Sequence, residues 1–94
     1  MSGFINIGFG NLVNTEQIVA VVSPDGAPVR RLVQGAREAQ KVVDATQGRK
    51  TKSVIVTDSG FVILSALIPD TIARRLPTAG PLLTAAPDRR ESLE

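Results

Sequence analysis

Apolar residues along this chain fall into short runs that favour strands over long helices. The runs are rich in β-branched residues and are separated by Gly, Asn, Asp and Ser, which is typical of strands joined by turns. The clearest pair flanks Asp58-Ser59-Gly60 and predicts a hairpin. Strands are expected at Phe4–Ile7, Leu12–Asn14, Gln17–Val22, Val42–Thr46, Ser53–Thr57 and Phe61–Leu67.

One segment shows the period of an amphipathic helix. Pro28 suits the first helical turn, where its missing N–H is not needed. The pattern predicts a helix from Pro28 to near Lys41, followed much later by a short helix over Thr71–Leu76. The apolar positions of the first helix are Val29, Leu32, Val33 and Ala36.

This order of elements predicts an α+β domain: a small, strongly twisted, mainly antiparallel sheet with one main helix and a short C-terminal helix. Phe61–Leu64 has no polar alternation, so both faces of that strand need cover. The main helix is expected on one face. The other is expected to meet the short helix and, in part, another subunit, because large apolar patches are rare on monomers.

We expect two parts along the chain, a folded domain over 1–76 and a disordered tail over 77–94. The tail carries three prolines, many small residues and mixed charge. A domain this small is only marginally stable by itself, which favours association. No secretory signal or bilayer-spanning run is visible, so a cytoplasmic protein is expected.

The inventory of side chains narrows the chemistry. The chain has no Cys and no His, which excludes a disulfide framework, a thiol nucleophile, the usual zinc sites and a Ser-His-Asp arrangement. Its nine acidic residues are scattered. We therefore expect no enzyme activity, no metal or cofactor and no small-molecule ligand.

The net charge of +2 is modest, but the charges are unevenly placed. Residues 1–76 hold nine cations and six anions, a net of +3. Arg49, Lys50 and Lys52 lie within four residues, in a stretch without acids. Because their loop enters a strand, we expect an anchored backbone and cations suited to phosphates. The alternative is a solvated loop whose charges oppose aggregation of the adjoining apolar strand.

Other motifs are weaker. Gly8-Phe9-Gly10 begins like a dinucleotide fingerprint but lacks its third Gly, and a turn between strands explains it better. Arg30 and Arg31 on the main helix are candidates for secondary DNA contacts, or simply a solvated face. The three Phe residues lie in apolar strands or a glycine turn, so we expect no exposed aromatic platform among the cations.

Taken together, the order of these segments resembles the RemA family, the bacterial extracellular-matrix regulatory protein A group. The likeness covers roughly residues 3–76 in one order. It rests on Phe4–Asn14, Val22-Ser23-Pro24, Ala27–Arg31, Asp44–Lys52 and Val62–Ala66.

The resemblance implies a cytoplasmic bacterial regulator that binds double-stranded DNA as a ring-like homo-oligomer and activates biofilm matrix genes. It implies DNA-binding roles for Arg49, Lys50 and Lys52, two of which are arginines in the family. Lysine keeps the charge but loses the bidentate fork. Gln17 stands where the family commonly has an arginine associated with ring assembly. The alternative is a structural or protein-interaction ring with no direct nucleic-acid role.

Overall fold

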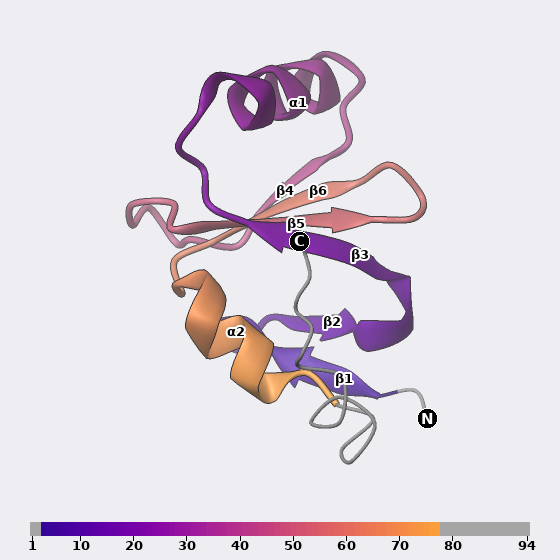
Figure 1. The fold of residues 1–94 in the computed structure, drawn as a ribbon, viewed down its shortest axis with the longest axis vertical. Helices are drawn as coiled ribbons and strands as arrows, with labels where there is room; N and C mark the ends of the chain where they lie inside the picture. The colour runs from indigo at the N-terminus through magenta and orange to yellow at the C-terminus, as the bar shows by residue number, and fades with distance from the viewer. Residues whose placement is uncertain (1–2, 78–94) are drawn as a thin grey trace, which may run out of the picture.

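The computed structural model describes residues 3–77, so almost all of the expected tail lies outside the described residues. Figure 1 shows its helices and strands. None of the helices within 3–77 is long and apolar enough to cross a membrane. In chain order the elements are β1 (Phe4–Asn6), β2 (Leu12–Asn14), the 3-10 helix η1 (Thr15–Gln17), β3 (Ile18–Val22), α1 (Ala27–Glu38), β4 (Val42–Asp44), β5 (Ser53–Thr57), β6 (Val62–Ser65) and α2 (Pro69–Arg75).

The expected α+β class is confirmed, with the strands divided between two sheets. A four-stranded sheet has the order β3-β5-β6-β4, and β1 and β2 form a separate antiparallel hairpin. β5 pairs antiparallel with β3 and β6, whereas β4 pairs parallel with β6, Val43 opposite Ile63. The parallel pair was not anticipated. Because β3 and β6 flank β5 on both sides, β4 is placed at an outer edge of the sheet, where it runs in the same direction as β6.

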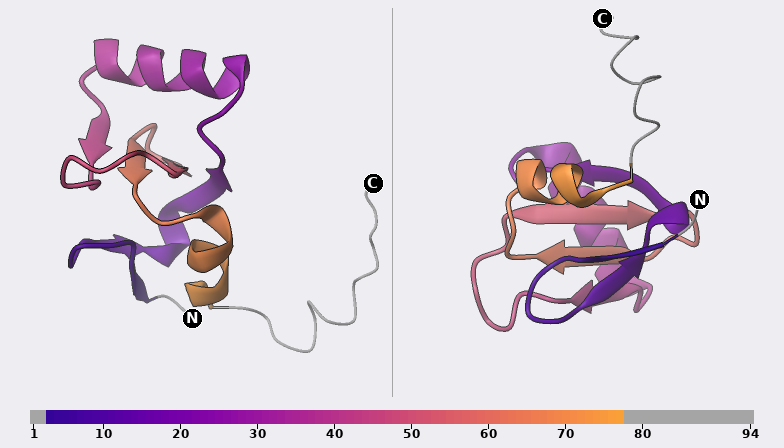
Figure 2. Two further views of the ribbon diagram at one scale, coloured as in Figure 1. Left: turned by 90° about the vertical axis from the view of Figure 1, so that its left-hand side faces the viewer. Right: turned by 90° about the horizontal axis from the view of Figure 1, so that it is seen from below.

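The four-stranded sheet is the middle of three layers, with α1 on one face and the β1–β2 hairpin and α2 on the other (Figures 1 and 2). Because side chains alternate along a strand, β5 and β6 contribute to both sides. The α1 side buries Ala36, Val54, Val62 and Leu64. The opposite side buries Ile5, Ile7, Val13, Ala45, Ile55 and Ile72.

On the face of the sheet opposite α1, where another subunit was expected to give part of the cover, the single chain covers β5 fully and β6 only in part. Ile55 is 0% exposed within the single chain, and so is Ile72 of α2 above it. The N-terminal hairpin supplies the missing cover, since Ile5 and Val13 point into the same cluster. Ile63 of β6 stays partly exposed on this face, so the contact with another subunit stays a prediction there.

The main helix ends earlier than its periodicity predicted, at Glu38 rather than near Lys41. Gln40 adopts φ +60°, and the Lys41 and Gln40 amides donate to the carbonyls of Ala36 and Arg37. This is a Schellman cap, which uses the left-handed residue to stop the helix. The helix also turns Leu32 outward, at 43% exposed, so only three of its four expected apolar positions face the sheet.

Candidate nucleic-acid interface

The cationic loop between β4 and β5 is fixed at both ends, as its sequence predicted. At its start, the Ala45 amide donates to the Leu64 carbonyl at 2.9 Å, and at its end the Lys52 amide donates to the Ser65 carbonyl at 2.8 Å. In between, the Arg49 amide closes a turn on the Thr46 carbonyl at 2.9 Å. These bonds hold the backbone that carries the cations, so little chain entropy is lost when a ligand binds.

Asp44 and Thr46 lock the entry to this loop. The Asp44 carboxylate accepts from the Thr46 hydroxyl at 2.6 Å and from the Thr46 amide at 2.9 Å. These two hydrogen bonds, the side-chain one first, lower the pKa of Asp44 despite some desolvation, and nearby Arg37 lowers it further. Gln47 and Gly48 then take left-handed conformations, φ +54° and +79°, which turn the chain sharply toward Arg49.

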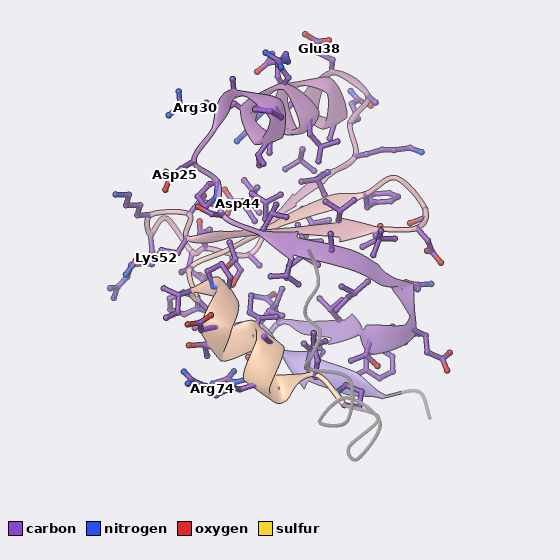
Figure 3. All side chains as sticks on the ribbon, in the orientation of Figure 1. Asp25, Arg30, Glu38, Asp44, Lys52 and Arg74 are labelled. Carbon is purple, nitrogen blue, oxygen red and sulfur yellow. The ribbon has the colours of Figure 1, made fainter. Side chains whose placement is uncertain are left out.

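Arg49, Lys50 and Lys52 line one open hollow of about 600 Å³, together with Gly8, Phe9, Ala66 and Leu67. We call it the basic hollow. All three cations are largely solvent-exposed or at its rim, and no carboxylate is among the lining residues. It lies at the end of the sheet where β5 begins and β6 ends. Figure 3 shows Lys52 projecting from the loop to the side where Arg30 and Arg74 also project, with Asp25 between Arg30 and the loop.

Arg30 and Arg31 of α1, the predicted secondary DNA contacts, lie in different surroundings. Arg30 lines a smaller neighbouring hollow with Arg37 and Thr51, next to the cationic loop, whereas Arg31 does not line it. Lys41, near which the helix was predicted to end, lies beyond the end of α1. The Lys41 ammonium sits 3.4 Å from the Ser59 carbonyl and 5.7 Å from the Phe61 ring, at the opposite end of β5.

The expectation of no exposed aromatic among the cations is wrong. Phe9, at the tip of the β1–β2 hairpin, is 52% exposed and lines the basic hollow. The sequence offered one signal for it, a bulky apolar residue between two glycines. Folding of the hairpin over β6 was needed to bring the tip beside a loop some forty positions away. Arg74, on α2, is a further exposed cation on this side that sequence reasoning did not select (Figure 3).

Gln17 lies in a different environment. It ends η1, its carbonyl accepts from the Asp58 amide at 2.9 Å, and it is exposed. It helps to line a second hollow of about 400 Å³, which we call the apolar hollow. Four large apolar side chains around it remain exposed: Phe4 at 66%, Leu12 at 62%, Val43 at 45% and Phe61 at 39%.

The described part of the chain offers little for metal chemistry. Among residues 3–77 there is no group of three or more His, Cys, Asp or Glu side chains placed to hold an ion. The basic hollow offers positive charge, and the apolar hollow offers exposed apolar surface.

Comparison with known proteins places this arrangement in a family. The family model described as "RemA-like: Extracellular matrix regulatory protein A-like" matches residues 4–76. A protein of Geobacillus thermodenitrificans is 57% identical over 76 residues, covering 81% of this chain and 87% of its own length. One from Synechococcus sp. is 55% identical over 80 residues, covering 85% and 90%. Both carry the name "Putative regulatory protein". The chain belongs to the RemA-like family.

Proposed function

We propose that this chain is a transcriptional regulator that binds double-stranded DNA as a ring-like homo-oligomer, without enzymatic chemistry. Each subunit presents Arg49, Lys50 and Lys52 to the phosphate backbone. The family description, which names an extracellular matrix regulatory protein, and the names of the relatives support a regulatory role. The targets that we propose are the genes of the biofilm matrix. The proposal places the protein in the cytoplasm, with access to the chromosome.

The observation that carries the proposal is the basic hollow. Three cations project from a loop whose backbone is hydrogen-bonded to Leu64 and Ser65 of the sheet, in a hollow lined by no acid. Cations in this setting displace condensed counterions from DNA, which drives binding with little regard to sequence. The two lysines suit phosphate contacts better than guanine readout, because they lack the planar fork of arginine.

A few phosphate contacts give only loose binding, so the proposal needs several subunits acting together. The apolar hollow supports this part, because its four exposed side chains offer surface that a second copy can bury. Gln17 lies in the same hollow. Two edges of the four-stranded sheet, β3 and β4, also lack a strand partner within residues 3–77. Linking many weak sites raises overall affinity by about two to four powers of ten.

A salt titration of duplex affinity, with native mass measured on the same samples, tests the proposal. We expect an oligomer whose binding constant falls linearly with salt on a double-logarithmic plot, with a slope of about −0.9 per phosphate engaged. An oligomer without salt-sensitive duplex affinity would instead indicate a protein-interaction ring. A single chain that binds DNA weakly would remove the multivalent part of the proposal.

A further inference from the structure

Phe9 has an unusual backbone conformation for an exposed aromatic residue. It adopts φ +55°, between Gly8 at +113° and Gly10 at +78°. Side chains with a Cβ atom strain this region, and Asn or Gly would occupy it more easily. At 52% exposed, the ring also leaves much of its apolar surface in water. Core packing therefore does not account for an aromatic residue here, and strained residues of this kind cluster at binding sites.

The turn that carries Phe9 is held rigidly. The Asn6 carboxamide oxygen accepts from the Gly8 amide at 2.7 Å. The Gly8 carbonyl accepts from the Asn11 amide at 3.0 Å and from the Asn11 side chain at 2.9 Å. The Ile7 amide also donates to the Asn11 carbonyl at 2.9 Å, which closes the base of the turn. The ring is presented by a fixed loop.

The same residue of β6 fixes this turn and the cationic loop relative to one another. The Ser65 hydroxyl donates to the Ile7 carbonyl at 2.7 Å, directly before the turn. The Ser65 carbonyl accepts from the amide of Lys52, the last of the three cations, at 2.8 Å. Phe9 and the cations thus line one hollow on two segments that are both tied to Ser65, with little freedom to separate. A ligand whose phosphates reach the cations meets the ring as well.

We propose that Phe9 packs its ring into the minor groove of duplex DNA, against deoxyribose and base edges, while Arg49, Lys50 and Lys52 hold the flanking phosphates. This rests on the proposed DNA-binding function and adds a second, apolar component to it. Proteins that bind the minor groove often place apolar side chains against or between base steps. The cations make binding salt-dependent, whereas contact with the ring does not release counterions.

The variant Phe9→Asn tests this, because Asn accepts a left-handed backbone and the turn should fold at least as well. We expect duplex affinity to fall about five- to tenfold at every salt concentration, with the salt slope unchanged. Phe9→Tyr keeps the ring and should bind within about twofold of the original protein. Leu32→Asn is the matched control, since Leu32 is 43% exposed on α1, away from the hollow, and its variant should bind normally.

Three results would overturn the inference. Duplex affinity unchanged in Phe9→Asn would mean that the ring makes no contact. A changed native mass would assign Phe9 to subunit assembly. An equal or larger loss on a single strand of the same length would assign it to stacking on unpaired bases. Failure of the underlying function looks different, because the unaltered protein would then show no salt-sensitive duplex binding at all.

Discussion

The basic hollow and the apolar hollow share one element, the N-terminal hairpin, but present opposite chemistry. The tip of the hairpin brings Phe9 to a loop of three cations, while its outward strand face brings Phe4 and Leu12 beside Phe61. The first hollow suits a polyanion and the second suits another copy of the chain. The hairpin closes the core on one side of the four-stranded sheet and divides the remaining surface there into two kinds of site.

A substitution in the apolar hollow should lower the affinity for DNA although it changes none of the cations. Leu12→Asp should leave the single chain folded, because Leu12 is 62% exposed on β2. A buried carboxylate in the subunit contact should release single chains and lower duplex affinity about a hundredfold, by loss of multivalency. Native mass and duplex titration check this. Leu32→Asp on α1 is the control, and an unchanged mass in Leu12→Asp would place the contact elsewhere.

Asp44 and Thr46 fix the start of the cationic loop by hydrogen bonds, which we call the loop anchor. Its loss should affect DNA binding at the basic hollow and leave the subunit contact unchanged. Thr46→Val removes the hydroxyl that donates a hydrogen bond to the Asp44 carboxylate. Because Thr46 is only 2% exposed, the loss should lower the free energy of unfolding by about 1–2 kcal/mol. Duplex affinity should fall about fivefold because the cations lose their fixed support. Native mass should not change. Denaturant unfolding and duplex titration measure both effects, and a variant with normal stability would contradict the anchoring role.

The same anchor predicts a pH dependence. The folded pKa of Asp44 is below its ordinary value of 3.8, so the anchor stabilises the fold fully above that value. This stabilisation is lost as the pH falls through the lowered pKa. In Thr46→Val the pKa of Asp44 should rise toward 3.8, because the hydrogen bond from the Thr46 hydroxyl, the largest cause of the lowered pKa, is gone. NMR titration of the Asp44 carboxyl group can follow this change.

Substitutions on α1, the helix beside the cationic loop, should have the smallest effect on duplex affinity. Arg30 lines a hollow beside the cationic loop and Arg31 does not, although the two are adjacent in sequence. Arg30→Ala should weaken duplex binding about threefold, whereas Arg31→Ala, with the same loss of charge, should leave it nearly unchanged. Equal losses in the two variants would indicate a general effect of net charge and remove α1 from the interface.

Local signals in the sequence were sufficient for much of the fold. Turn chemistry at Asp58-Ser59-Gly60 and the β-branched run of Ser53–Thr57 predicted the central hairpin correctly. The cationic loop was also predicted with its anchored backbone, since its residues are contiguous. The Schellman cap at Gln40 was missed because Gln carries no signal for a left-handed conformation.

Features that depend on tertiary neighbours could not be predicted in the same way. The parallel pairing of β4 with β6 depends on which sheet edge is free. The place of Phe9 beside Lys52 depends on Ser65, which binds both segments through different atoms. Neither follows from periodicity or from turn residues, because each joins segments that are far apart in the chain.

One pair of variants tests the central claim most directly. Lys50→Ala and Lys41→Ala remove the same charge, but Lys50 lines the basic hollow, whereas Lys41 lies against Ser59 and Phe61 at the far end of β5. The salt dependence of duplex affinity should be measured for both, with native mass on the same samples. We predict that Lys50→Ala lowers the slope by about 1 for each engaged subunit, and that Lys41→Ala retains the original slope. Identical slopes in the two variants, at equal mass, would contradict the account.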